Sequence, residues 1–411
     1  MKIAQINMVN SGSTGTIMQQ LARCAREQGH LVHTYSARPF AKRYAKLPPS
    51  QEDHEYFGTY LENGIHYVLG SFLGLNGLFS WLGTWRLIGA LRRFQPDVIH
   101  LHNLHKFCVS LPVLFRYLKR QSAPVLWTFH DCWSFTGHCP DLNLEACDKW
   151  KTGCGDCGAY KRYPKSRVDA SRFMYRCKKR WFTGVPRLTV VTPSHWLANL
   201  AGQSYMREYP IRVMPNGVDT GIFKPSAGDF RQRYHCQDKF VLLGVAFGWS
   251  SQKGLDVFIA LAGRLNPTFQ IVLVGTDEAV KRRLPPNILP IDRTGSPQVL
   301  AEIYSAADLF VNPTYADNFP AVNLEALACG TPVVTFAVGG SREMLNGRCG
   351  FSVEKGNIDA LQMEIERIAR ERPYKPEDCR SRAVEFDIRV RFGAYMRLYE
   401  DLTHCPKGSL S

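Results

Sequence analysis

The chain has 411 residues, which is too many for one ordinary hydrophobic core, and this length predicts roughly two to three domains. Hydrophobic residues make up 45% and charged residues 21%, a balance that is normal for a globular protein and excludes low-complexity disorder. The net charge of +15 predicts attraction to phosphate groups or acidic lipid. Because no DNA- or RNA-binding motif accompanies this charge, nucleic acid is not an expected partner.

The first half of the chain alternates short apolar strands with helical stretches. Gly12 and Gly15 are expected in a turn that precedes a helix at Thr16–Gln28, and Ser194 is the expected N-cap of a later helix that ends near Gly202. Strands are expected at Lys2–Asn7, Leu31–Ala37, Asp97–His102, Val125–His130 and Leu188–Pro193. This alternation predicts a parallel sheet with helices on both faces.

One stretch in this half, Ile65–Leu91, is rich in aromatic and aliphatic side chains and is followed by Arg92 and Arg93. Glycines interrupt it, and no run of about 18 apolar residues occurs anywhere, so no transmembrane helix is expected. The opening residues MKIAQINMVNSG also lack the apolar segment of a signal peptide. The stretch is interpreted either as a helix pair under the sheet or as a surface that dips into lipid.

A second unit of the same kind follows a boundary expected within Arg207–Pro215. The expected domains are residues 1–207, residues 208–388, and a C-terminal helix in residues 389–411 that packs back on the first domain. Strands are expected at Phe240–Val245, Phe269–Gly275, Leu309–Asn312 and Pro332–Phe336, and helices at Leu255–Leu265, Val299–Ala306, Ala321–Ala328, Ile358–Ala369 and Arg389–Leu402. The predicted fold is therefore α/β, with two Rossmann-like doubly wound domains that face each other across a cleft.

The segment PTYADNFPAVNLEALACGTPVV at Pro313–Val334 carries two carboxylates that are separated by seven residues. Asp317 follows an expected strand, and Glu325 lies about two turns into the next helix. Both can therefore face one pocket, beside the free N–H groups of the helix N-terminus. The spacing alone is a weak signal, but its place after a strand and within EALACGTPVV favours a ligand-binding site.

Three further stretches complete a pattern over nearly the whole chain: NGVD at Asn216–Asp219 with FKP at Phe223–Pro225, WSSQKGLD at Trp249–Asp256, and HLHN with WTFHDCWSFTGHC. The pattern resembles the family 4 retaining glycosyltransferases with the GT-B fold. It is most similar to the subgroup that builds capsular, colanic-acid-type and other exopolysaccharides.

The resemblance implies a role for each residue that matches the family motif in the second domain. Glu325 would accept hydrogen bonds from the donor ribose, and Asp317 would hold hydroxyls of the transferred sugar. Backbone N–H groups near Asn318 and Phe319 would hold the sugar and the diphosphate. Lys253 would pair with the diphosphate and stabilise charge on the leaving group.

In the first domain, the resemblance places the Gly12–Gly15 loop near the diphosphate and His130 beside the transferred sugar. His102 and Asn103 are candidates for the acceptor side. A satisfied core histidine is the alternative interpretation of His130, but its position at a strand end favours the active site.

The sequence departs from the family pattern at two positions. The first acid is Asp317, which is one methylene shorter than the glutamate found in many members. Many members also have an arginine five residues before the phosphate lysine, where this chain has Gly248. Arg293 is the candidate that supplies the missing positive charge.

Cys139, Cys147, Cys154 and Cys157 lie within one 19-residue stretch. Thiolates at such spacing can close a structural zinc site, although the first gaps are unlike those of common zinc fingers. Four reduced cysteines without a metal are the alternative.

The resemblance implies transfer of a hexose-type sugar from a UDP- or GDP-sugar, with no cofactor required for catalysis. The resemblance implies a glycan or polyprenyl-diphosphate-linked acceptor and a cytoplasmic enzyme at the inner face of the cell membrane, in contact with anionic lipid. The alternatives are a nucleotide-sugar epimerase, a phosphorylase, and a nonenzymatic nucleotide-sugar binder. A dinucleotide-dependent oxidoreductase is disfavoured because no full G-x-G-x-x-G follows the first strand.

Overall fold

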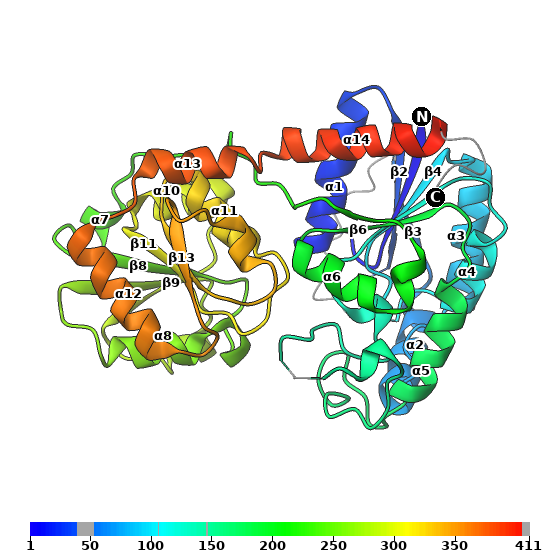
Figure 1. Cartoon of the computed structure of the whole chain (residues 1–411), viewed down its shortest axis with the longest axis horizontal. Coiled ribbons are helices and arrows are strands. Elements are labelled where there is room, and N and C mark those ends of the chain that lie inside the picture. Colours follow the sequence, from blue (N-terminus) through cyan, green and yellow to red (C-terminus); the bar gives the residue numbers. More distant parts are fainter. Residues whose placement is uncertain (39–52, 106, 145–146, 405–411) are drawn as a thin grey trace. The chain divides into compact units, whose positions relative to one another are not determined.

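The computed structural model describes residues 1–38, 53–105, 107–144 and 147–404. They form two compact units, one comprising Met1–Met214 with the segment that begins at Phe392, and the other comprising Pro215–Arg391 (Figure 1). The chain therefore enters the second unit after Met214 and returns to the first after Arg391. In the described residues, no helix combines the length and the apolar character that a membrane span needs.

The first unit is built on a seven-stranded parallel sheet with the order β3-β2-β1-β4-β5-β6-β7. Its strands are β1 (Lys2–Asn7), β2 (Leu31–Ala37), β3 (His54–Phe57), β4 (Val98–Leu101), β5 (Val125–Thr128), β6 (Leu188–Thr192) and β7 (Ile211–Val213). The five expected strands are present. The edge strands β3 and β7 were not expected because each is short and carries polar residues, so neither shows an apolar run.

The helices of this unit are α1 (Gly12–Glu27), α2 (Tyr60–Leu73), α3 (Trp81–Phe94), α4 (Leu111–Leu118), α5 (Ser171–Phe182) and α6 (His195–Gln203). The Ser194 hydroxyl accepts a hydrogen bond from the Leu197 N–H and caps α6, as expected. The turn predicted at Gly12 and Gly15 is wrong, because α1 begins at Gly12 directly after the extended residue Ser11. Both glycines therefore lie in the first turns of that helix.

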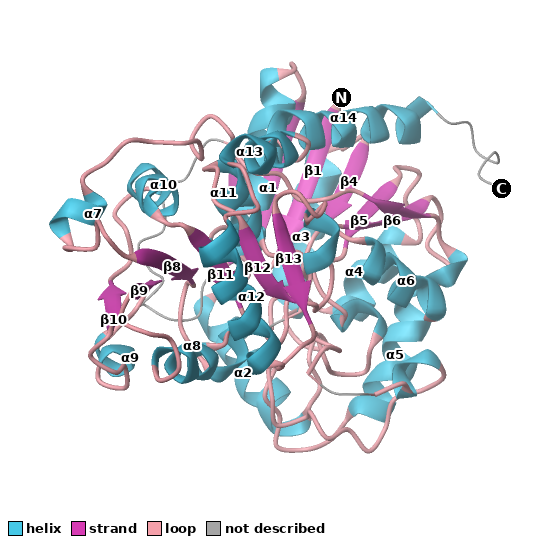
Figure 2. Cartoon of the chain, turned by 60° about the vertical axis from the view of Figure 1, so that its left-hand side comes forward, coloured by secondary structure: helices cyan, strands magenta, loops and turns pink. Residues whose placement is uncertain are grey.

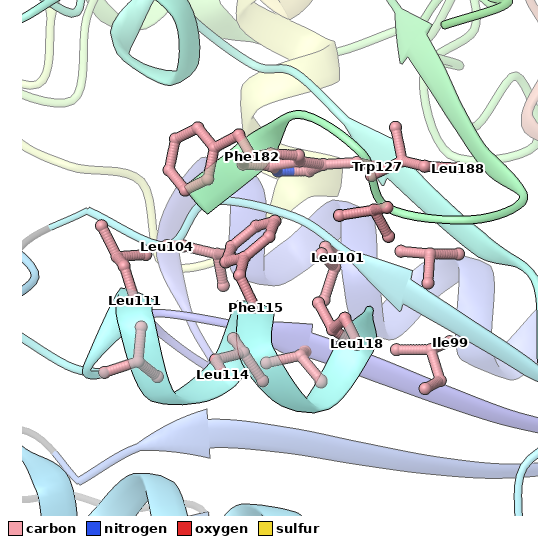
Figure 3. Packing of buried hydrophobic residues seen from close by; sticks show 14 of the residues in the cluster. Ile99, Leu101, Leu104, Leu111, Leu114, Phe115, Leu118, Trp127, Phe182 and Leu188 are labelled. Atoms are coloured by element: carbon pink, nitrogen blue, oxygen red, sulfur yellow. The ribbon is translucent and has the colours of Figure 1, made fainter. Parts of the chain in front are cut away.

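The core of the first unit packs α4 and α5 against the sheet. Figure 3 shows Phe115 of α4, Phe182 of α5 and Trp127 of β5 packed in one cluster, in which each ring contacts the other two. The rings of Trp127 and Phe182 meet edge to face with centroids 4.9 Å apart, an arrangement that stabilises aromatic pairs beyond their buried area. This packing fixes the carboxyl ends of β4 and β5, where polar side chains follow.

The second unit holds a six-stranded parallel sheet with the order β10-β9-β8-β11-β12-β13 (Figure 2). Its strands are β8 (Phe240–Val245), β9 (Phe269–Val274), β10 (Ile288–Ile291), β11 (Leu309–Asn312), β12 (Val333–Phe336) and β13 (Gly350–Val353). Its helices are α7 (Phe230–Arg233), α8 (Leu255–Ala262), α9 (Glu278–Lys281), α10 (Pro297–Ala306), α11 (Ala321–Ala328), α12 (Ile358–Glu371) and α13 (Pro376–Val384).

Alternate residues of these strands enter two separate cores. On β8, Val241 and Leu243 pack with α10, α11 and α13, whereas Leu242 packs with α8 and α12. Figure 1 shows the same division, with α10, α11 and α13 on one side of the strands and α8 and α12 on the other. A parallel sheet covered on both faces is the predicted doubly wound arrangement, and it is present in both units.

The last described helix, α14 (Ile388–His404), begins in the second unit and carries buried side chains into the first. The Tyr399 hydroxyl lies 2.6 Å from Nδ1 of His100 on β4, and the other ring nitrogen of His100 lies 2.8 Å from the Thr128 hydroxyl on β5. Burial lowers the pKa of His100 to about 3, so its ring is neutral. Both nitrogens of this buried ring therefore have a hydrogen-bond partner, and the partner of Nδ1 comes from α14.

Candidate active site

The strand order reverses between β8 and β11 in the second unit, and such a reversal opens a ligand-binding crevice at the carboxyl ends of the strands. Lys253 follows β8 in the short 3-10 turn Ser251–Lys253, and Asp317 follows β11. A cavity of about 530 Å³ lies at the other, amino ends of the strands, beside Asp308 and Pro332, which precede β11 and β12. The strand topology favours the edge with Lys253 and Asp317 for phosphate-bearing ligands.

Lys253 and Asp317 form a partly exposed ion pair at this edge. The Lys253 ammonium lies 2.8 Å from Oδ2 of Asp317, and the two side chains are 40% and 24% exposed. The other carboxylate oxygen, Oδ1, accepts a hydrogen bond from the Asn318 N–H at 2.9 Å. An ion pair this exposed contributes only about 0–1 kcal/mol, so a charged ligand can open it at little cost.

Two glycines allow the backbone to bring this pair together. Gly254 has a φ of +78°, and a Cβ there would lie 2.4 Å from the Pro313 carbonyl oxygen. Gly339 has a φ of +51°, and a Cβ there would lie 2.0 Å from the Asp317 carbonyl oxygen. Any side chain at either position would push the Asp317 loop away. Gly339 was not singled out from the sequence, because its contact is distant along the chain.

Glu325, the fifth residue of α11, is half-buried. Its Oε2 accepts a hydrogen bond of 2.9 Å from the Tyr304 hydroxyl on α10. Burial raises the pKa of Glu325 to about 7, and the hydrogen bond from Tyr304 partly opposes this rise. The carboxylate thus keeps one oxygen, Oε1, for further donors. The Tyr304 contact was missed because the sequence shows only a helical tyrosine.

Arg293 lies beside the position where many family members carry an arginine. Its Nη2 donates a hydrogen bond of 2.6 Å to the Phe247 carbonyl, and its guanidinium carbon lies 3.6 Å from the centroid of the exposed Phe247 ring. Phe247 directly precedes Gly248. The positive charge of Arg293 is therefore held next to the backbone of Gly248.

In the first unit, polar side chains gather at the carboxyl ends of β4 and β5. Nδ1 of His102 lies 3.1 Å from Nε2 of His130, and burial lowers the pKa of His130 to about 4. Asp131 accepts hydrogen bonds from His105 at 2.8 Å and Asn103 at 3.3 Å. Burial opposes ionisation of Asp131, but the charge and hydrogen bond of His105 outweigh it and lower the pKa. The His105–Asp131 pair was missed, because HLHNLH offers three histidines of equal appearance.

In the first unit the strand order reverses between β1 and β4. Gly12 and Gly15 follow β1 and lie in the first turns of α1. The Asn7 amide at the end of β1 donates a hydrogen bond of 3.2 Å to the Thr14 hydroxyl and ties the strand end to this helix. The free N–H groups of such a helix N-terminus suit a phosphate.

The four cysteines of the candidate zinc site line one cavity in the first unit. The sulfurs of Cys139 and Cys157 lie 3.8 Å apart, and none of the four cysteines forms a disulfide. Across the residues that the structure describes, no group of three or more histidines, cysteines or acidic residues is already gathered closely enough to hold a metal ion. The structure thus brings the sulfurs of Cys139 and Cys157 together but does not gather all four sulfurs around one point.

Comparison with known proteins identifies the family. Residues 14–221 match the family described as Glycosyltransferase Family 4, and residues 238–371 match the family described as Glycosyl transferases group 1. The chain belongs to glycosyltransferase family 4. The second match contains Lys253, Arg293, Asp317 and Glu325.

One relative of this family 4 glycosyltransferase spans almost its whole length, and another matches less than half of it. It is 23% identical to the putative colanic acid biosynthesis glycosyl transferase WcaC of Escherichia coli K12, over 90% of this chain and 92% of that protein. It is 32% identical to the D-inositol 3-phosphate glycosyltransferase of Arthrobacter sp. FB24, over 42% of this chain and 44% of that protein.

Solved structures show the same fold. The sucrose-phosphate synthase of Thermosynechococcus elongatus has a TM-score of 0.72 at 19% identity and covers 98% of both chains. The Anabaena protein Alr3699/HepE in complex with UDP has a TM-score of 0.71 at 17% identity and covers 98% of this chain and 100% of that chain. These likenesses confirm the predicted GT-B fold for this family 4 glycosyltransferase.

Proposed function

We propose that this glycosyltransferase moves a hexose-type sugar from a nucleoside diphosphate sugar to a glycan or lipid-linked acceptor, with retention of anomeric configuration. The Lys253–Asp317 ion pair at the β8/β11 reversal carries the proposal. In the structure the ammonium and the carboxylate pair with each other. When a donor binds, its diphosphate would take Lys253, and Asp317 would become free to accept hydrogen bonds from sugar hydroxyls.

The reaction needs positioning and charge stabilisation more than acid–base catalysis. The acceptor oxygen bonds to the anomeric carbon on the face from which the diphosphate leaves. The bond from that carbon to the phosphate oxygen breaks, its electron pair stays on the phosphate, and the phosphate oxygen takes the acceptor proton. Lys253 and Arg293 would stabilise the charge that develops there. His130, with its lowered pKa, is neutral at pH 7 and would serve as a hydrogen-bonding contact.

Two relatives support the donor and the product class. The Anabaena neighbour binds UDP, and the Escherichia coli relative is a putative colanic acid enzyme. A UDP-sugar donor, with a GDP-sugar as the other candidate, and a polysaccharide product therefore fit this chain best. We propose no cofactor for catalysis, because two cations of the protein can balance the diphosphate charge.

A panel of nucleotide sugars tests the proposal. The true donor is expected to raise the melting temperature most, since binding to the folded state stabilises it by mass action. Incubation with that donor and a lipid-linked acceptor should then give a product whose anomeric configuration, measured by NMR, matches the donor. Conversion of the donor without acceptor would indicate an epimerase, and a requirement for inorganic phosphate would indicate a phosphorylase. Binding without turnover would indicate a nonenzymatic binder.

The position of Arg293 gives a prediction that a second substitution can check. Arg293→Ala should lower kcat/KM about tenfold or more, because a charge-assisted contact to phosphate contributes about 1.5–3 kcal/mol. Gly248→Arg in that background should restore part of the activity. A Cβ at Gly248 meets no atom within 4 Å, so the larger side chain has room. Loss without rescue would mean that Arg293 only supports the Phe247 loop.

A second surface, formed by α2 and α3, concerns how the enzyme reaches its acceptor. The helices α2 and α3, predicted as an apolar pair, expose many large hydrophobic side chains, with Leu61 75%, Trp81 57%, Leu82 67% and Trp85 56% exposed. Arg92 and Arg93 at the end of α3 are also exposed. Tryptophan, leucine and arginine side by side suit the boundary between anionic headgroups and acyl chains. We propose that this face rests on an anionic membrane that carries the lipid-linked acceptor.

Flotation with vesicles tests the membrane face. The protein is expected to float with vesicles that contain phosphatidylglycerol and less with pure phosphatidylcholine, and added salt should weaken the binding. Replacement of Trp81, Leu82 and Trp85 by serine should abolish flotation and leave donor-induced thermal stabilisation intact. Met363→Ser, on α12 and 71% exposed, is the matched control and should float normally. Equal flotation of both variants would refute the proposal.

A further inference from the structure

The segment between η2 (Trp133–Phe135) and α5 contains little regular secondary structure, with only the 3-10 turn at Lys149–Lys151 in its described part. It nevertheless encloses a cavity of about 260 Å³. Cys139, Cys147, Cys154 and Cys157 all line that cavity. A segment with so few backbone ladders needs another source of order, and neither the fold nor the donor site uses these thiols.

The spacing of two sulfurs suits metal coordination better than a disulfide. The sulfurs of Cys139 and Cys157 are 3.8 Å apart. A disulfide would require about 2.05 Å. Four sulfurs arranged tetrahedrally around zinc, each about 2.3 Å from the metal, lie about 3.8 Å from one another. The observed pair therefore forms one edge of such a tetrahedron, and Cys147 and Cys154 lie near enough to interact electrostatically with Cys139.

Two neighbouring groups could stabilise negative charge on the sulfurs, against burial, which favours the neutral thiol and raises the pKa of Cys154 to about 11. The Gly137 N–H donates a hydrogen bond of 3.2 Å to the Cys154 sulfur. The ammonium of Lys178, which is fully buried, interacts electrostatically with Cys154 and Cys139. That ammonium also donates to the Trp133 and Thr136 carbonyls, which are neutral partners. Asp131 supplies one negative charge that acts on this buried cation, and thiolate sulfurs would add to it, whereas neutral thiols add none.

A buried histidine in the same cavity has a spare nitrogen. His138 is 7% exposed and lines the cavity, and its Nε2 has no hydrogen-bond partner in the structure as described. The ring also hydrogen-bonds the Arg162 backbone, which leaves Nε2 as the ring nitrogen available for a hydrogen bond to a sulfur. Hydrogen bonds of this kind are the usual outer support of metal-bound thiolates.

We propose that Cys139, Cys147, Cys154 and Cys157 bind one zinc ion as thiolates and that this ion orders the segment. Binding releases four thiol protons, and the Zn(S⁻)₄ group carries a net charge of −2, which Lys178 partly balances. Zinc would draw Cys147 and Cys154 toward the Cys139–Cys157 edge. Because protein sulfurs fill all four positions, the ion would be structural and would not bind substrate. This inference is independent of the sugar-transfer proposal.

Metal analysis of the full chain, purified under reducing conditions without a metal-binding tag, tests the proposal. We expect about one zinc per chain, and an absorption spectrum of thiolate-bound tetrahedral cobalt after Co²⁺ replaces zinc. Cys139→Ser/Cys157→Ser and Cys147→Ser/Cys154→Ser should each lose the metal. Cys24→Ser, a half-buried cysteine on α1 outside the cavity, should retain it.

A readout on the wild-type chain guards against variants that misfold. Removal of zinc by a chelator should speed proteolysis within residues 139–157, and re-addition of zinc should reverse this change. Less than about a tenth of an equivalent of zinc would overturn the proposal. So would a full equivalent retained in either double variant, or a Cys139–Cys157 disulfide in the freshly purified protein.

Discussion

Lys253→Ala is expected to lower kcat/KM for sugar transfer by about 10²–10³-fold, the loss typical when one preorganised charge partner of a leaving group is removed. The ammonium is half-exposed, and Asp317 is its ion-pair partner among the described residues. Its removal should therefore leave the melting temperature within a few degrees of the wild type. Steady-state kinetics with the donor found in the panel, together with thermal unfolding, measure both quantities.

Two variants make this result specific. Lys253→Arg keeps the charge and should retain more activity than the alanine variant. Lys239 precedes β8, at the amino ends of the strands of the same sheet, and donates a hydrogen bond to the Pro267 carbonyl. Lys239→Ala should leave transfer unchanged. Full activity in Lys253→Ala would remove the basis of the proposed donor site.

Glu325→Gln is expected to weaken donor binding by about 10–100-fold, because the ribose hydroxyls lose a charged acceptor. The wild-type affinity should also depend on pH. Burial raises the pKa of Glu325 to about 7, and ribose hydroxyls would donate to the ionised form. Donor affinity should therefore rise as the pH passes upward through about 7. Calorimetric titration at several pH values measures this, and the glutamine variant should show a flat profile.

The stability of the same variant gives an internal control. The pKa of Glu325 is higher in the folded chain than its ordinary value of 4.5. Ionisation therefore disfavours the fold, and the loss of stability grows as the pH rises from about 4.5 to about 7. Glu325→Gln should remove this penalty and melt no lower than the wild type at pH 8. A variant that melts much lower would indicate misfolding, and an unchanged donor affinity would refute the assigned role.

The elements that could be predicted from the sequence are those with local signals. The apolar runs of β1 and β8 and the capping serine of α6 depend on neighbouring residues, and their positions agree with the prediction to within a residue or two. The family resemblance likewise rested on continuous motifs. The apolar pair α2 and α3 was expected, but periodicity could not tell which of its faces is covered.

What could not be predicted depends on contacts between distant residues. Tyr304 reaches Glu325 across 21 positions, and His105 reaches Asp131 across 26. The backbone approach at Gly339 follows from how two loops cross, which no spacing in the sequence encodes. The start of α1 was misplaced for a different reason, because two glycines indicate a turn in isolation and tertiary packing overrides that preference.

The hydrogen bond between His100 and Tyr399 also bears on the order in which the chain folds during synthesis. His100 lies on a central strand of the first unit, yet its partner emerges from the ribosome only after every residue of the second unit. Units usually fold in the order of their synthesis. Here the second unit can complete its core before the first unit does. In the first unit, the His100 ring has only one of its two hydrogen-bond partners until Tyr399 is synthesised. The first half of this enzyme therefore reaches its final packing last.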